Sequence, residues 1–107
     1  MVKSDSRYDL KGRVWIYPGM AAWHFVTVPK KEAEEIRARF VMLTRGFGSL
    51  KVKVTIGKTS WDTSIFPDKK EGTYLLPIKA SVRKKEKIAA GETIEFVVEI
   101  KGGARPQ

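Results

Sequence analysis

The sequence predicts a mainly β domain, a small closed barrel of about six strands with two short helices. Several short segments alternate apolar and polar residues, which is typical of half-buried strands. Two other segments repeat apolar residues at spacings of three and four, as amphipathic helices do. The chain has 107 residues, 42% of them hydrophobic, which suits a single core. Closing so few short strands into a barrel protects their edges.

We expect one domain over residues 10–101, between an N-terminal tail at residues 1–9 and a flexible C-terminal tail at residues 102–107. The last six residues include no large apolar side chain that would anchor them to a core. No linker between the tails is long enough to divide the chain into two domains.

The first half is expected to contain two strands and a helix. Residues 13–17 are β-branched and aromatic and stop at a Pro-Gly turn, while residues 23–28 form a second strand that stops at Pro29. We expect a helix to begin near Lys30, directly after Pro29, because proline is well tolerated in the first turn of a helix. The apolar stripe of this helix consists of Ala33, Ile36, Phe40 and Leu43.

Residues 50–65 predict a β-hairpin with a defined register. Apolar side chains alternate along residues 50–56, and Gly57-Lys58 is a two-residue turn with glycine first. This turn places Trp61 opposite Val54, so the indole is expected to face inward. The remaining aromatic side chains are also expected mostly at inward positions.

The second half repeats the order strand, proline, helix, strand. Residues 73–76 form a short strand that ends at Pro77, residues 80–88 form a helix, and residues 92–100 alternate as the last strand. We interpret the repeated order as two related halves that close one barrel.

Four motifs in this order carry a family resemblance: Trp23-His24-Phe25-Val26-Thr27-Val28-Pro29, Gly46-Phe47-Gly48-Ser49, Trp61-Asp62-Thr63-Ser64-Ile65-Phe66-Pro67, and Leu76-Pro77-Ile78-Lys79-Ala80-Ser81-Val82-Arg83-Lys84 followed by Gly91-Glu92. They resemble a small β-barrel family of unknown function, whose members occur alone or beside a bacteriocin-protection (OmpD-associated) type domain. The resemblance implies a double-split β-barrel, the architecture of AbrB- and MazE-like DNA-binding domains, with both halves in one chain. It implies no catalytic residues.

Composition excludes several classes of site. The chain has no cysteine, which removes disulfides, thiolate nucleophiles and cysteine-based metal sites. The first nine residues lack the apolar segment of a signal peptide, and no apolar run approaches the roughly 18 residues of a membrane helix. We therefore expect a cytoplasmic protein without a membrane partner. The absence of asparagine and the 31% charged residues are a thermophile-like bias.

No group of residues has the pattern of a catalytic or metal site. His24 is the only histidine and alternates with valines along its strand, so we interpret it as a packed structural residue. Hydroxyl and carboxyl groups gather on one hairpin arm, but no nucleophile motif surrounds them. Asp62 is expected to pair with Lys53 across the hairpin, a contact worth roughly 0.2–1 kcal/mol. We expect neither an enzyme nor a cofactor or metal.

The positive charge is the remaining functional signal. The net charge is +9, and residues 51–87 carry ten Lys and Arg against four Asp and Glu, a net +6. The candidate nucleic-acid or anion contacts are Lys51, Lys53, Lys58, Lys79, Arg83, Lys84 and Lys87. Trp15 and Tyr17, flanked by Lys11 and Arg13, are the candidate stacking residues.

Two functions remain open at this point. The first is a non-enzymatic binding module for nucleic acid or another anion, sequence-tolerant because lysine supplies point charge rather than bidentate base contacts. The alternative is a barrel that binds another protein or domain, or a small ligand, and whose charge only confers solubility. An apolar pocket would favour the alternative.

Overall fold

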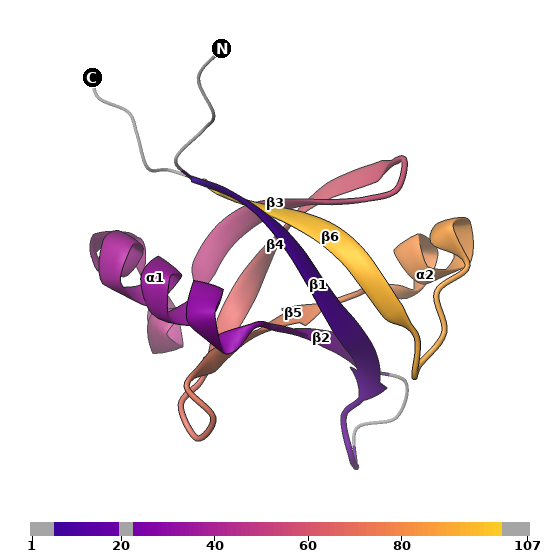
Figure 1. Cartoon of the computed structure of the whole chain (residues 1–107), viewed down its shortest axis with the longest axis horizontal. Coiled ribbons are helices and arrows are strands. Elements are labelled where there is room, and N and C mark those ends of the chain that lie inside the picture. Colours follow the sequence, from indigo (N-terminus) through magenta and orange to yellow (C-terminus); the bar gives the residue numbers. More distant parts are fainter. Residues whose placement is uncertain (1–5, 20–22, 102–107) are drawn as a thin grey trace.

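Six antiparallel strands close into a barrel in the computed structural model, which describes residues 6–19 and 23–101 (Figure 1). The elements are β1 (Arg7–Ile16), β2 (His24–Val28), α1 (Lys30–Phe40), β3 (Leu50–Ile56), β4 (Thr59–Asp68), β5 (Thr73–Pro77), α2 (Ala80–Glu86) and β6 (Thr93–Ile100). Two short 3-10 helices, Val41–Leu43 and Gly46–Gly48, join α1 to β3. The strands close in the order β1-β2-β5-β4-β3-β6, which confirms the predicted six-stranded barrel with two helices.

The strand order is unchanged when the two halves of the chain are exchanged. Replacing β1 with β4, β2 with β5 and β3 with β6, and the reverse, gives the same closed cycle. Each ten-residue strand changes partner along its length: β1 pairs first with β6 and then with β2, and β4 pairs first with β3 and then with β5. The predicted relation between the halves is present in this topology.

The barrel interior is filled by alternate side chains from all six strands. The strand residues with relative exposure below 2% are Val14, Val26, Val28, Leu50, Val52, Val54, Ile65, Tyr74, Leu76, Phe96 and Val98. The helices lie outside the strands (Figure 1). α1 buries Ala33, Ile36 and Phe40, and α2 buries Val82. Burial of such apolar side chains is the main source of folding stability.

The β3–β4 hairpin has the predicted register. Trp61 lies opposite Val54 and Thr59 lies opposite Ile56. Gly57 adopts a φ of +58°, as the first central residue of a II′ turn must. Trp61 is partly buried and packs against the core, so the predicted inward orientation is only partly realised.

The first strand begins earlier than predicted. β1 starts at Arg7, so residues 7–9, assigned above to the N-terminal tail, belong to the barrel and pair with β6. Tyr8 and Leu10 are buried on its inward face, and the pattern is interrupted at Gly12. A Cβ on Gly12 would meet Val26 and the carbonyl of Thr27, so close strand packing requires glycine there.

Other boundaries differ by a few residues. β4 extends beyond the predicted hairpin, through Pro67 to Asp68. α1 ends at Phe40, and Leu43 of the predicted apolar stripe follows in a 3-10 turn. α2 ends at Glu86, because Lys87 adopts a left-handed conformation with a φ of +56°. Within the described residues, neither helix is long and apolar enough to cross a membrane. The predicted C-terminal tail lies outside those residues.

Candidate functional site

The edge of β4 that faces β5 is paired along only part of the strand. Residues 59–65 pair with β3, but only residues 66–68 pair with β5. In a hairpin closed by a two-residue turn, every second residue directs its main-chain groups to the partner strand. The main-chain groups of Ser60, Asp62 and Ser64 therefore point away from β3, where no described strand pairs with them.

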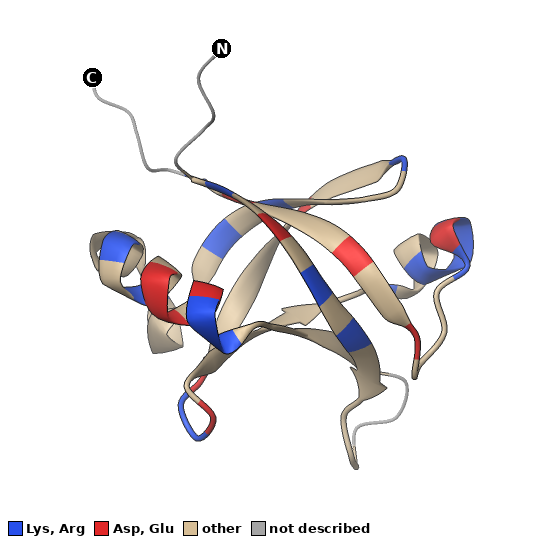
Figure 2. Ribbon diagram, in the orientation of Figure 1, with Lys and Arg blue, Asp and Glu red and all other residues tan. Residues whose placement is uncertain are grey.

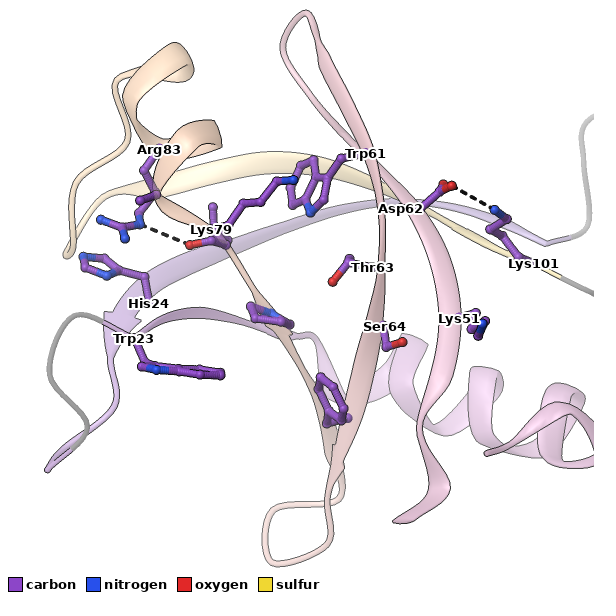
Figure 3. A pocket seen from close by; sticks show the side chains of 14 residues that line it. Trp23, His24, Lys51, Trp61, Asp62, Thr63, Ser64, Lys79, Arg83 and Lys101 are labelled. Carbon is purple, nitrogen blue, oxygen red and sulfur yellow. Dashed lines mark hydrogen bonds and ion pairs between the residues drawn. The ribbon is translucent and has the colours of Figure 1, made fainter. Parts of the chain in front are cut away.

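A cleft of about 720 Å³ lies along this open edge (Figure 3). One wall consists of residues 61–64 and Phe66 from β4. The opposite wall consists of residues 77–80, which connect β5 to α2, together with Arg83 from α2. The other lining residues are Trp23 and His24, near the start of β2, and Lys51 and Lys101.

Three aromatic side chains line the cleft. Trp23 is 51% exposed and Phe66 is 42% exposed, although both are large apolar groups. Trp61 is partly buried and packs against the core while it also lines the cleft. Exposed aromatic faces at a cavity are suited to stacking against a planar group of a ligand.

The cleft also carries four cations, of which one is paired. Lys101 Nζ lies 3.1 Å from Asp62 Oδ2, and the carboxylate offsets the charge of this lysine. Arg83 Nε donates a hydrogen bond of 3.1 Å to the carbonyl of Ile78, which holds the guanidinium at the cleft (Figure 3). Lys51 and Lys79 make no ion pair with another described residue. The excess charge favours an anionic ligand.

The structure gathers three of the seven predicted basic residues. Lys51, Lys79 and Arg83 line the cleft, whereas Lys53, Lys58, Lys84 and Lys87 do not. Lys and Arg are spread over both helices, several strands and the β3–β4 turn (Figure 2). The basic residues therefore do not all lie at one site, even though they are close in sequence.

The predicted ion pair between Lys53 and Asp62 is wrong. The two residues are opposite each other in the register, but Asp62 pairs with Lys101, just beyond β6. The amide of Lys101 donates to the carbonyl of Lys51 at 2.9 Å, which brings this third segment beside the hairpin. A solvated cross-strand pair is too weak to exclude such a competitor.

The predicted stacking residues belong to a second aromatic group beside the cleft. Trp15, Tyr17, Trp23 and Phe25 form this outer aromatic cluster, with ring centroids 5.3–6.1 Å apart in neighbouring pairs. Trp15 is half-buried, and its Nε1 donates a 2.9 Å hydrogen bond to Thr27 Oγ1. Tyr17 is 43% exposed. Trp23 belongs to both the cluster and the cleft.

Sequence reasoning missed Trp23, Phe66 and Lys101 as cleft residues. Trp23 and Phe66 were expected to face inward with most other aromatics, but both are exposed. The alternation of β4 contained the signal for Phe66, because its neighbour Ile65 is fully buried. No local pattern places Lys101 beside β3.

The polar groups of the cleft come from both of its walls. Figure 3 shows His24 and Arg83 on one side of the cleft and Thr63 and Ser64 on the other. The Asp62 carboxylate is engaged by Lys101. No group of three or more His, Cys, Asp or Glu able to hold a metal occurs in the part of the chain that the structure describes.

Two tyrosines that lie away from the cleft have raised pKa values. Burial raises the pKa of the Tyr8 hydroxyl, an effect that the nearby Arg39 guanidinium opposes. Burial likewise raises the pKa of Tyr74, and Arg37 opposes it. Neither residue lines the cleft, so these shifts concern stability rather than the site.

The comparisons with known proteins give a family but no activity. A search of curated proteins found no significant match. A family model described as a domain of unknown function (DUF1905) matches residues 11–98, which run from β1 to β6 and include most of the cleft lining. The chain therefore belongs to the DUF1905 family.

Proposed function

We propose that this protein is a non-enzymatic binding module that holds single-stranded nucleic acid in the cleft with little dependence on sequence. The observation that carries the proposal is that three aromatic rings and the cations Lys51, Lys79 and Arg83 line one cleft. Bases stack on the rings while the cations contact phosphates. Every base has a π-face, so such binding tolerates different sequences.

Two further features support this ligand class. The net charge of +9 attracts polyanions over a distance and accelerates their association. The resemblance to AbrB- and MazE-like DNA-binding domains supports nucleic acid by analogy of fold, which is the weaker argument because one fold hosts many functions.

The first experiment measures the salt dependence of binding by fluorescence anisotropy. A labelled oligothymidylate of about 12 nucleotides should bind at about 50 mM salt. With about three phosphate contacts, its affinity should fall roughly 20-fold at about 200 mM salt. A duplex contacted at six or more phosphates would lose about 10³-fold. Absence of binding at low salt would overturn the proposal.

Matched variants locate the binding site. Lys79→Ala and Lys51→Ala should each weaken oligonucleotide binding several-fold, because each removes a cation from the cleft. Their controls are Lys84→Ala on α2 and Lys53→Ala on β3, which remove the same charge outside the cleft lining. Equal losses in the control variants would show that only net charge matters.

A peptide-binding function is the second candidate, favoured by the open edge of β4. The main-chain groups of Ser60, Asp62 and Ser64 are free to pair with an added strand. The probe is an extended peptide of about eight residues that alternates Glu and Val. Protection of these three amides from hydrogen exchange by the peptide, without oligonucleotide binding, would favour this candidate.

A further inference from the structure

The outer aromatic cluster continues the cleft onto the surface of β1 and β2. Trp23 lines the cleft, and its ring centroid lies 5.9 Å from that of Phe25. The Phe25 ring lies 5.8 Å from the Tyr17 ring. Trp23 and Tyr17 are 51% and 43% exposed, whereas Phe25 is 8% exposed. Two accessible rings therefore flank one buried ring.

The positions of the two accessible rings are tied together by main-chain contacts. The amide of Tyr17 donates a 2.9 Å hydrogen bond to the carbonyl of Trp23. Phe25 lies opposite Trp15 in the strand pairing, and the Trp15 indole is anchored by Thr27. A ring surface held in place before binding loses little conformational entropy when a base stacks on it.

A cation follows the rings along β1. Side chains of a strand alternate between its faces, so Arg13 shares the outer face with Trp15, whose ring centroid lies 6.1 Å from that of Tyr17. Arg13 is exposed and lies opposite Thr93 of β6, so its cross-strand neighbour is uncharged. Lys11 lies further along the same face, but it is opposite Glu95. Arg13 is therefore the better placed of the two to contact a phosphate.

We propose that the nucleic-acid strand leaves the cleft at Trp23 and continues over the outer aromatic cluster, with a base stacked on Tyr17 and a phosphate at Arg13. This path rests on the proposed function and specifies its ligand. The ligand is a chain of roughly four or more nucleotides rather than a single nucleotide. Short strands occupy the cleft alone, and longer strands reach Tyr17.

The test compares two oligonucleotide lengths on three variants. Labelled oligothymidylates of about 3 and about 12 nucleotides are titrated by anisotropy. Tyr17→Ala should weaken binding of the longer strand about five-fold or more and leave the shorter strand unchanged, because one stacked base is lost. Tyr17→Phe keeps the ring and should bind both strands like the unaltered protein. Phe47→Ala should also leave both unchanged, because it removes an aromatic ring that is 94% exposed and outside the cleft and the cluster.

The outcomes separate the path from the proposed function. If the cleft variants weaken binding but Tyr17→Ala does not change the affinity for the longer strand, the path is overturned and the cleft remains the site. An equal loss for both lengths in Tyr17→Ala also overturns the path, because Tyr17 would then act at the cleft or on the fold. If neither oligonucleotide binds to the unaltered protein at low salt, the proposed function itself is overturned.

Discussion

The two halves of the barrel have the same topology but cover their long strands differently. In the first half, α1 is eleven residues long and buries three side chains. In the second half, α2 is seven residues long and buries Val82. The shorter helix belongs to the half that supplies most of the cleft lining.

The aromatic residues near the two helices show the consequence. Tyr8 of β1 is only 8% exposed; its hydroxyl accepts a 2.7 Å hydrogen bond from Arg39 Nη1 and lies 3.4 Å from Glu35 Oε2, so α1 closes over it. Trp61 of β4 stays partly exposed in the cleft. α2 is bonded to the hairpin at its turn, where Thr59 Oγ1 donates to Glu86 Oε2 at 2.5 Å. A repeated scaffold thus leaves one half closed and the other open.

The largest expected effect on stability comes from truncating the buried side chains of the two helices. Ile36 is fully buried, so Ile36→Ala should lower the free energy of unfolding by about 2–5 kcal/mol. Val82→Ala removes fewer buried atoms and should cost roughly 1–3 kcal/mol. Urea denaturation measures both. A loss below about 1 kcal/mol for Ile36→Ala would contradict the view that α1 is held to the barrel by its buried side chains.

The next largest effect on stability is expected where Glu86 of α2 contacts the turn of the β3–β4 hairpin. Gly57 has a φ of +58°, and a Cβ there would meet the Glu86 carboxylate. Gly57→Ala should therefore lower the free energy of unfolding by about 2 kcal/mol. Glu86→Ala relieves the clash, so the double variant should lose less than the sum of the single variants. Strict additivity in denaturation experiments would show that the turn and α2 are independent.

Alkaline pH is expected to act on both halves through buried tyrosines. Burial raises the pKa of Tyr8 and Tyr74 above the ordinary value of 10.0, so the unfolded chain loses these protons first. Their contribution to stability is complete below about pH 10 and is lost as the pH rises through the folded-state pKa values. Tyr8→Phe and Tyr74→Phe should each reduce the loss of stability between about pH 8 and pH 11. An unchanged alkaline loss in both variants would refute this origin.

The smallest expected effect on stability comes from the ion pair in the open half. Asp62 and Lys101 are solvent-exposed, so Asp62→Asn should change the free energy of unfolding by less than about 1 kcal/mol. Oligonucleotide binding should nevertheless strengthen several-fold, because the cleft loses a carboxylate and Lys101 is left without that partner. Glu34→Gln makes the same charge change on exposed α1 and is the matched control. A similar gain in that control would assign the effect to net charge.

The hairpin shows why much of the fold was predictable. Its register follows from the two-residue turn and from the alternation on both arms, which are local properties of the chain. The start of β1 was missed because Gly12 interrupts that alternation. The need for glycine arises from the close approach of β2, which no local pattern records.

The cleft was less predictable because its residues come from distant segments. The sequence identified Lys51, Lys79 and Arg83 among seven basic residues, but it contained no criterion to separate them from the other four. Trp23 joins the site through the pairing of β2 with β5, which places Phe25 opposite Pro77 and brings the amide of Ile78 to the carbonyl of His24. Strand periodicity shows which side chains share a face, but not which strand edge stays unpaired.

The sequence by itself determined the element types, the repeat of two halves, the hairpin register and the excess of positive charge. These follow from backbone preferences, side-chain periodicity and composition, which act over a few residues or over the whole chain. Only the tertiary structure decided where the barrel is open, which cations gather and which aromatic rings remain exposed. Those features depend on how strands distant in sequence pair and on how far each helix covers them, so they appear only once the barrel has closed.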